Sequence, residues 1–303
     1  MTMQKPILLC AVFAACSGNA ASSDGPLGQL DAATIVLPPE LANATRVLWV
    51  GAHPDDETVA APLLARICLA RGVKCTFLIF TRGEGGSCGL MTCGGNLGEF
   101  RTAEMRTSAA LYNADVVQWD LGNEAAVSID DAVANFVRHT GSIELLTKKI
   151  GDEISRLAPD AIITFDPRNG VTCHPDHRAT AAALIATLRN RPLLTPAQTW
   201  MLATRLVTDG ADIERSTWIG YAPYTADPAA VTLDVSGSDD QGTPWWQHLV
   251  GTLRAHRSQF SDSVVEKFEA APTAQRTVTL LALRDAREND ATYACEAPSA
   301  ARF

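Results

Sequence analysis

The sequence predicts an α/β protein with a Rossmann-like, mostly parallel sheet flanked by helices. Two observations lead to this fold class. Short apolar runs of strand length alternate along residues 46–207 with longer segments whose apolar residues recur at helical spacing. The strand-length runs are apolar throughout, as in strands that are buried on both faces. After residue 207 the alternation becomes irregular, which predicts a C-terminal β/α elaboration.

The first predicted elements follow from these runs. A buried strand is expected at 46–50, where four apolar residues precede the flexible Gly51. The helical spacing of leucines and isoleucines predicts a helix at 57–71, with Gly72 as its stop. Apolar runs predict further strands at 74–80 and 116–121, with a helix at 99–113 between them. Residues 127–140 are predicted to be a loop with a helical turn.

The second half continues the pattern. Helices are expected at 143–157 and 178–189 on either side of an apolar strand at 161–165, and another strand is expected at 199–207. The elaboration is predicted to contain strands at 217–224, 231–235 and 275–283 and a helix at 245–260. No internal repeat or linker interrupts the sequence. A single domain is therefore expected over residues 46–303, preceded by an irregular segment at 22–45.

Composition narrows the class of partner. The chain has 303 residues, of which 47% are hydrophobic and 19% charged, as in ordinary soluble globular proteins. The net charge is -9. This acidic balance argues against a nucleic-acid partner and does not exclude a neutral or cationic substrate. The composition makes no prediction of the oligomeric state.

The first 21 residues have the pattern of a secretory signal peptide. Lys5 precedes an apolar run at 6–15, and small residues follow up to a predicted cleavage site near Ala20. An imperfect lipoprotein signal that would lipidate Cys16 is an alternative. Either interpretation predicts an exported protein that is periplasmic, secreted or lipid-anchored at the outer surface, with membrane contact only through such an anchor.

Six of the eight cysteines lie beyond the signal peptide. An exported protein can keep disulfides. Cys88 and Cys93 lie close together in a glycine-rich loop and are the expected pair. The sequence does not fix the other connectivities.

A polar cluster follows the first predicted strand directly. His53, Asp55, Asp56 and Glu57 place an imidazole and three carboxylates within five positions. In open α/β sheets the carboxyl ends of the strands bind ligands. The alternative is a solvated, acidic helix start, which carboxylates favour in any case. A second, complementary cluster is needed to decide between the two.

That second cluster is His174, Asp176 and His177, and it follows the predicted strand at 161–165. Both clusters are expected at the same sheet edge, where they would meet. Two imidazoles and a carboxylate with an open fourth position form the ligand set of a catalytic zinc site. A lone histidine is more often structural, but two clusters at matching positions favour the metal site. The G-x-G-x-x-G fingerprint of dinucleotide-binding enzymes is absent after the first strand.

These two motifs, Ala52-His53-Pro54-Asp55-Asp56-Glu57 and His174-Pro175-Asp176-His177, resemble those of the LmbE/PIG-L family of zinc-dependent N-acetylglucosaminyl deacetylases. The stretches 81–86, 97–104 and 255–259 are also similar to family elements. The resemblance covers roughly residues 46–259. It implies a single LmbE/PIG-L-like domain that hydrolyses the acetamide of an N-acetylated sugar or sugar conjugate. The substrate that the resemblance implies is therefore a small molecule or a glycan.

The resemblance also implies roles for individual residues. His53, Asp56 and His177 would bind Zn²⁺ or another divalent metal. Asp55 would be the general base. His174 would stabilise the oxyanion or protonate the leaving amine, with Asp176 orienting it. These roles fit the chemistry, because amide hydrolysis needs an activated water, charge stabilisation and a carboxylate that is not a metal ligand.

Other residues keep two interpretations. Arg82, Glu84 and Arg101 are candidates for substrate binding, although Arg82 and Glu84 could instead pair with each other on a solvated loop. His256 could be a structural residue of a late helix. Cys173 stands where the family usually has glycine, and it could approach the metal or form a disulfide, for example with Cys295.

A different class of function is a non-catalytic, exported carbohydrate-binding protein that retains the fold. The aromatic residues Tyr221, Tyr224, Trp245 and Trp246 could then stack on sugars, although such residues are more often core or rim aromatics. The intact set of histidines and aspartates favours the enzyme.

Overall fold

The computed structural model describes residues 36–90, 93, 95–191, 199–208, 218–223, 228–270, 277–285 and 295. The predicted signal peptide at 1–21, its alternative lipidation site at Cys16 and Tyr224 lie outside these residues. Within the segment at 22–45, the described part contains the short helix α1 (Pro39–Ala42). Among the described helices, none combines the length and the apolar composition that a bilayer span requires.

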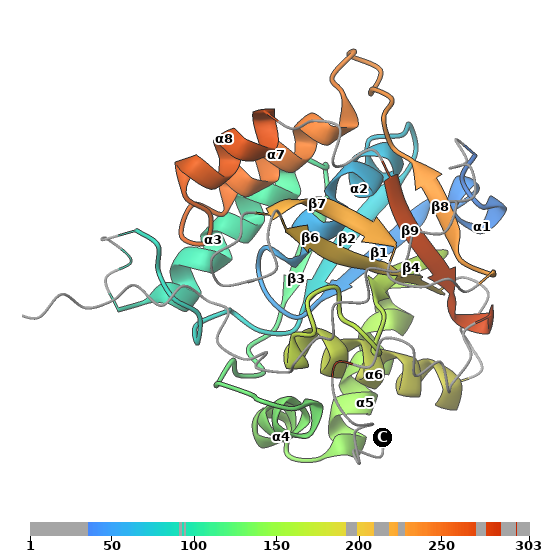
Figure 1. The fold of residues 1–303 in the computed structure, drawn as a ribbon. Helices are drawn as coiled ribbons and strands as arrows, with labels where there is room; N and C mark the ends of the chain where they lie inside the picture. The colour runs from blue at the N-terminus through green and yellow to red at the C-terminus, as the bar shows by residue number, and fades with distance from the viewer. Residues whose placement is uncertain are drawn as a thin grey trace, which may run out of the picture.

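A mixed sheet forms the centre of the fold. Its seven described strands lie in the order β3-β2-β1-β4-β5-β9-β8 (Figure 1). The strand bounds are β1 Arg46–Gly51, β2 Lys74–Ile79, β3 Asp115–Gln118, β4 Ala161–Phe165, β5 Thr199–Leu202, β8 Val231–Asp234 and β9 Thr277–Ala282. The first five strands are parallel, and β9 is antiparallel to both β5 and β8. The predicted Rossmann-like sheet with a C-terminal elaboration is therefore confirmed.

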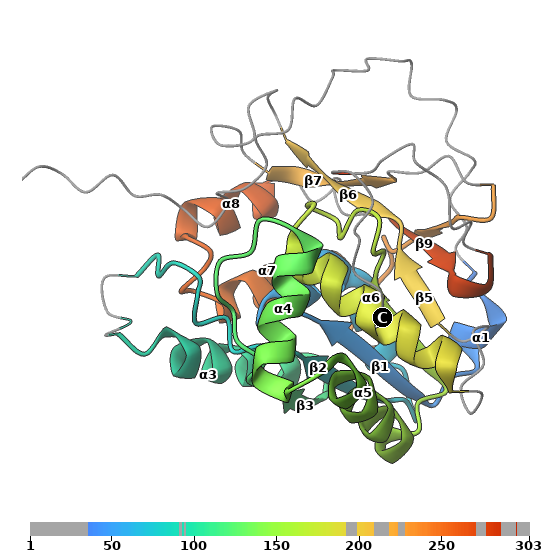
Figure 2. The ribbon, with the colours of Figure 1, turned by 90° about the horizontal axis from the view of Figure 1, so that it is seen from below.

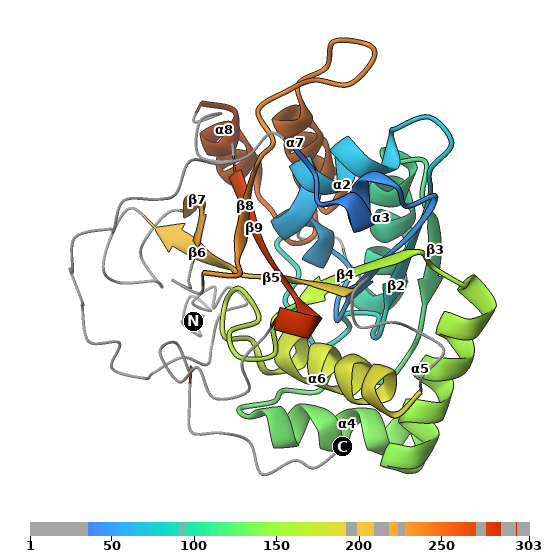
Figure 3. The same cartoon turned by 90° about the vertical axis from the view of Figure 1, so that its right-hand side faces the viewer.

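Helices cover both faces of this sheet (Figures 2 and 3). One face carries α2 (Ala61–Cys68), α3 (Leu97–Ala110), α7 (Trp245–Ala255) and α8 (Asp262–Ala270). The other carries α4 (Ile129–Thr140), α5 (Ile143–Leu157) and α6 (Pro175–Asn190). Strand β1 shows why two layers form. Val47 and Trp49 pack into one core, and Leu48 and Val50 into the other, because successive side chains of a strand point to opposite faces.

The order of the strands places a crevice beside β1. The chain builds β1, β2 and β3 outward in one direction and then returns to add β4 on the other side of β1, with Val50 paired to Thr164. Ligands bind at such a switch point, outside the carboxyl ends of the strands. The two polar motifs follow β1 and β4, so the topology brings them to this crevice.

Several predicted boundaries were wrong. Residues 127–140, predicted as a loop with a helical turn, contain the helix α4. Its buried face includes Val133 and Phe136, and its start is capped by the Ser128 side chain, which accepts from Asp131 N. The single strand predicted at 199–207 is two strands, because the chain leaves the main sheet after Leu202. Strand β6 (Thr204–Thr208) then pairs with β7 (Trp218–Pro223) in a separate two-stranded sheet. Helix α8 was not predicted.

Three disulfides join the described cysteines: Cys68–Cys75, Cys88–Cys93 and Cys173–Cys295. The predicted Cys88–Cys93 pair is confirmed. The pairing of Cys173 with Cys295 was one of two alternatives, and the pairing of Cys68 with Cys75 was not predicted.

Candidate active site

A cavity of about 370 Å³ opens at the switch point. Its wall combines the loops that follow β1, β2, β3 and β4 with the segment between α7 and α8. The residues of both polar motifs lie in this wall: His53, Asp55, Asp56, His174, Asp176 and His177. Arg101 lies in the same wall, so the structure brings together seven of the nine predicted site residues at one cavity.

The turn after β1 is built around the Asp56 carboxylate. Asp56 Oδ2 accepts hydrogen bonds from Ala52 N at 2.6 Å and His53 N at 2.8 Å. Gly51 permits this close approach, because a Cβ at that position would lie 3.1 Å from Asp56 Cβ. Asp55 has a φ of 109°, and the 3₁₀ helix Asp56–Ala60 begins directly after it. The turn thereby points the Asp55 and Asp56 side chains in different directions.

The second motif forms the first turn of α6. The helix was predicted to start at Arg178 but starts at Pro175, and His174 is its N-cap. His174 Nδ1 accepts a hydrogen bond from Asp176 N at 3.2 Å. His177 stacks on Phe165, the last residue of β4, with ring centroids 4.3 Å apart, and its Nδ1 lies 2.9 Å from Gly170 O. Each imidazole is therefore held through its Nδ1 atom by a hydrogen bond to the backbone.

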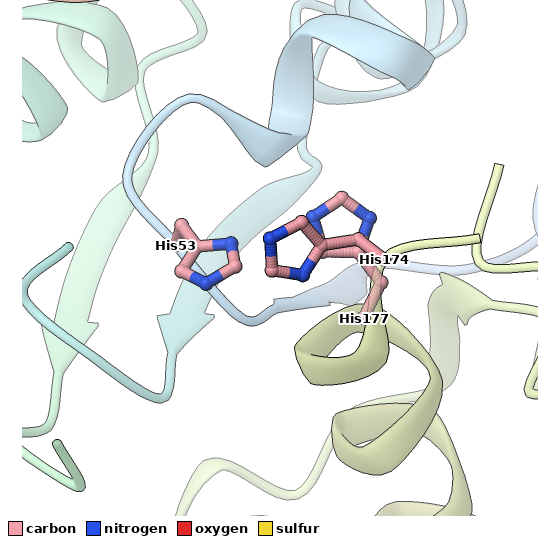
Figure 4. A group of neighbouring side chains, drawn as sticks. All are labelled: His53, His174 and His177. Carbon is pink, nitrogen blue, oxygen red and sulfur yellow. The ribbon is translucent and has the colours of Figure 1, made fainter. Parts of the chain in front are cut away.

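Three histidine rings meet at the centre of the site. Figure 4 shows His53, on the loop after β1, facing His174 and His177 at the start of α6. One ring nitrogen from each lies within 4.8 Å of the others, a spacing that could hold a metal ion. The Asp56 carboxylate is equally close. Its Oδ1 lies 3.0 Å from His177 Nε2 and 3.6 Å from His53 Nδ1.

These residues fit a zinc ion. Ligand atoms about 2.0–2.1 Å from a tetrahedral Zn²⁺ lie about 3.3 Å from one another, close to both distances from Asp56 Oδ1. Asp56 Oδ2 is already used by two backbone N–H groups, which leaves Oδ1 as the ligand atom. Asp176 Oδ1 also lies buried without a hydrogen-bond partner among the described residues, at a site that attracts cations.

The electrostatics of the site point to a bound cation. Burial lowers the pKa of His53, but the carboxylates of Asp56 and Asp176 outweigh it and raise that pKa to about 10. Burial raises the pKa of Asp56, and the neighbouring His177 and His53 reverse this shift, so that the pKa falls well below its usual value. The carboxylates thus make a buried negative field, which favours a positive charge at this point, whether a proton or a metal cation carries it.

Asp55 lies beside this cluster in a different environment. Burial raises the pKa of its carboxyl, although the nearby Arg101 guanidinium opposes the shift. Arg101 Nη2 lies 2.9 Å from Asp55 Oδ1 and also donates to Pro54 O, and Nη1 donates to Gly83 O at 3.0 Å. Arg101 is only 3% exposed. These contacts favour a role in holding Asp55 over the predicted role in direct substrate binding.

Two other predicted residues lie outside the central cavity. Arg82 and Glu84 line a second hollow of about 420 Å³, which shares Gly86 with the first. Arg82 and Glu84 do not form an ion pair with each other within the described residues. Arg82 faces Asp120 at 3.5 Å, and Glu84 accepts from Asn123 N at 3.0 Å. They remain candidates for the part of a substrate that extends beyond the metal cluster.

Asp176 contacts a different histidine from the one expected. Its Oδ2 lies 2.9 Å from His53 Nε2, and it reaches His174 only through the backbone N–H described above. Asn123, which sequence reasoning missed, donates from Nδ2 to Asp176 Oδ2 at 2.9 Å and lies 3.0 Å from His53 Nε2. The only available signal for Asn123 was its place in the loop after a parallel strand.

A buried pair of residues, Glu57 and His256, lies next to the turn after β1. Glu57 and His256 are both fully buried, with His256 Nε2 2.6 Å from Glu57 Oε1. Ser108 Oγ also donates to Glu57 Oε1. His256 therefore has the contacts of the structural residue that the sequence suggested, and Glu57, to which the sequence assigned no role, is its partner.

Of the proposed sugar-stacking aromatics, the two whose side chains are described, Trp245 and Trp246, do not line this cavity. Trp245 and Trp246 are partly buried against the core, and Trp245 packs beneath the Arg66 guanidinium at 5.2 Å. The side chain of Tyr221 and the whole of Tyr224 lie outside the described residues. The described aromatics thus give no support to a stacking platform.

The fold and the site define an α/β protein of Rossmann-like topology with a buried histidine–carboxylate cluster at its switch point. Comparison with known families agrees with this class. Residues 48–188 match the family PIG-L, described as GlcNAc-PI de-N-acetylase. These residues therefore form a domain that matches the PIG-L (LmbE-like) family.

Individual relatives are deacetylases. A 1D-myo-inositol 2-acetamido-2-deoxy-alpha-D-glucopyranoside deacetylase of Mycolicibacterium vanbaalenii is 29% identical over 245 residues, which cover 72% of this chain and 82% of the relative. A probable N-acetyl-alpha-D-glucosaminyl L-malate deacetylase 2 of Bacillus cereus is 30% identical over 149 residues, 48% of this chain and 62% of the relative. The solved N,N'-diacetylchitobiose deacetylase from Pyrococcus horikoshii has a TM-score of 0.54 and 19% identity, covering 84% of this chain and 90% of its own, and so shares the fold.

Proposed function

We propose that this chain is a zinc-dependent N-deacetylase that releases acetate from an N-acetylated sugar or sugar conjugate. One observation carries the proposal. Asp56 Oδ1 and the rings of His53 and His177 converge in a cavity beside Asp55, a partly buried carboxylate that contacts Arg101 instead of the histidines. The family match of residues 48–188 and the names of the relatives support the same chemistry.

The donor set would hold the metal through His53, Asp56 and His177. A zinc ion held there would supply a Lewis acid for the amide carbonyl and would lower the pKa of water to about 7. Asp55 would accept the proton of the attacking water. Its raised pKa gives it a greater proton affinity than an ordinary aspartate, and Arg101 fixes its direction.

His174 is suited to stabilise the oxyanion. Burial and the neighbouring His177 and His53 lower the pKa of His174 to about 3, so the ring is neutral at physiological pH. Its Nδ1 accepts the hydrogen bond from Asp176 N, so the single ring proton is on Nε2. A neutral imidazole with an Nε2–H can donate to a developing negative charge. Between the two roles implied for His174, this geometry favours the oxyanion.

The two hollows fit a substrate of at least two parts. The central cavity of about 370 Å³ has the size of a small-ligand site and would hold the acetamido sugar. The adjoining hollow of about 420 Å³, with Arg82 and Glu84 in its wall, would hold the group attached to that sugar. A sugar conjugate therefore suits the site better than free N-acetylglucosamine.

The test is acetate release from N-acetylglucosamine conjugates, including N,N'-diacetylchitobiose, before and after metal removal. We expect turnover to stop when a chelator removes the metal and to return when zinc is added, because the activated water depends on the ion. Magnesium added back at the same concentration is the control, since a site of two imidazoles and a carboxylate favours zinc. Glycan binding without acetate release, unaffected by the chelator, would instead support the non-catalytic carbohydrate-binding alternative.

Replacing Arg101 tests how Asp55 is held. In Arg101→Met, we expect kcat/KM at neutral pH to fall about 10²-fold, the loss that a small misplacement of a reacting group can cause. The guanidinium lowers the pKa of Asp55, so without it the pKa rises further, and the base is deprotonated only at higher pH. The acidic limb of the pH–kcat/KM profile should therefore move to higher pH. Arg106→Met, an exposed arginine on the same helix, should leave the profile unchanged.

We further propose that the protein is exported, as its N-terminal pattern predicts. The three disulfides support this proposal, since disulfides persist in oxidising compartments and are rare in the cytosol. The intact mass of the protein recovered outside the cytoplasm should show loss of residues up to about Ala20. A mass that includes a lipid on Cys16 would support the lipoprotein alternative, and a full-length cytoplasmic protein would contradict export.

A further inference from the structure

The loop between β4 and α6 has a backbone that its residues do not favour. Gly170, Val171 and Cys173 have φ values of 59°, 68° and 60°. Glycine adopts this left-handed region readily, but a β-branched valine and a cysteine rarely do. Val171 is also buried. Such a conformation persists only where the surrounding structure imposes it.

This loop determines how His177 is presented. Gly170 O lies 2.9 Å from His177 Nδ1, and that hydrogen bond fixes the tautomer and leaves Nε2 facing Asp56 Oδ1. His174, the N-cap of α6, follows Cys173 directly. A shift of the loop would therefore turn the His177 ring and move His174 at the same time.

Arg178 Nε joins the loop to α6 by donating to Pro167 O at 3.0 Å, but two backbone hydrogen bonds of the loop lie within it. Gly170 N donates to Asp166 O at 2.7 Å, and Cys173 N donates to Asn169 O at 2.7 Å. These bonds would move with the loop and cannot anchor it. The Cys173–Cys295 disulfide is a different kind of restraint, because it joins the loop to a residue 122 positions later, with Cα atoms 5.6 Å apart.

We propose that Cys173 and Cys295 are positioning residues for the metal site. Their disulfide holds Cys173 in the left-handed region and thereby keeps the Gly170 carbonyl on His177. The inference rests on the proposed zinc-dependent function. It goes beyond that function because it assigns the alignment of a metal ligand to a disulfide, one of whose cysteines is remote in sequence from the site.

Three double variants test the proposal: Cys173→Ala/Cys295→Ala, Cys173→Gly/Cys295→Ala and the matched control Cys68→Ala/Cys75→Ala. The control removes a disulfide that joins the end of α2 to the start of β2, at the edge of the sheet opposite the site. Zinc affinity is measured by competition with a chromophoric chelator, kcat and KM by acetate release, and folding by thermal unfolding.

We expect the Cys173→Ala/Cys295→Ala variant to bind zinc about tenfold more weakly, since removing a group that orients a metal ligand costs about 10- to 100-fold. Its kcat should fall similarly, with KM little changed. The glycine variant should recover most of both, because glycine adopts the left-handed conformation without a restraint. The control should bind zinc and turn over as the parent does.

Two results would overturn the inference: an alanine variant that matches the parent or the control in zinc affinity, or a glycine variant that is no better than the alanine variant. If the alanine variant fails to fold, parental zinc affinity in the glycine variant supports the inference and a tenfold loss there contradicts it. Failure of the proposed function is seen separately, because the parent protein itself would then neither bind zinc nor release acetate.

Discussion

Asp55→Asn should abolish most of the deacetylase activity while the protein keeps its zinc. Loss of a positioned general base costs about 10²–10⁴-fold in rate. The substitution should leave the structure intact, because an asparagine Oδ1 can still accept from Arg101, which lies 2.9 Å from Asp55 Oδ1. Asparagine also tolerates the positive φ of 109° at this position better than most residues do. The measurement is kcat/KM for acetate release together with zinc content per chain.

Two comparisons make this result specific. Asp115→Asn changes an exposed aspartate at the start of β3, at the opposite edge of the sheet, and should have parental activity. An Asp55→Asn protein with full zinc content and a rate within tenfold of the parent would show that another group accepts the proton. An Asp55→Asn protein without zinc would show that Asp55 belongs to the ligand set.

The parts of this site that could be predicted are those that topology brings together. His53 and His177 follow two buried strands, and the carboxyl ends of parallel strands meet at one edge whatever the details of packing. To predict that they converge, it was therefore enough to recognise two apolar runs and the two motifs that follow them. The central sheet was predictable for the same reason, because its strands are apolar throughout.

The parts that could not be predicted depend on contacts between distant segments. Arg101 and Asn123 reach the site from a helix and a loop whose sequences do not indicate the direction of their side chains. His256 reaches Glu57 from 199 positions away. The apolar run at 199–207 likewise does not reveal that the chain changes sheets at Ala203. Helix α4 is the exception, since the Ser128 cap was a local signal that sequence reasoning overlooked.

A comparison of Asp56→Ala with His174→Ala can decide which of these two residues is a metal ligand. The spacing of ring nitrogens alone allows His53, His174 and His177 as ligands. The contacts of Asp56 Oδ1 with His177 and His53 favour the set with aspartate. His174, in contrast, uses Nδ1 for the N-cap of α6 and keeps a proton on Nε2, so neither nitrogen is free as a ligand.

We therefore expect Asp56→Ala to weaken zinc binding by at least about 10²-fold, since a ligand should matter no less than the outer groups whose loss costs up to that much. His174→Ala should keep zinc affinity within a few-fold of the parent and lower kcat by about 10²–10³-fold, the cost of losing one oxyanion donor. Chelator competition and steady-state kinetics on both variants measure the two effects. The reverse pattern, with zinc lost from His174→Ala and retained by Asp56→Ala, would assign the metal to the three histidines and leave Asp56 as the residue that shapes the turn through Ala52 N and His53 N.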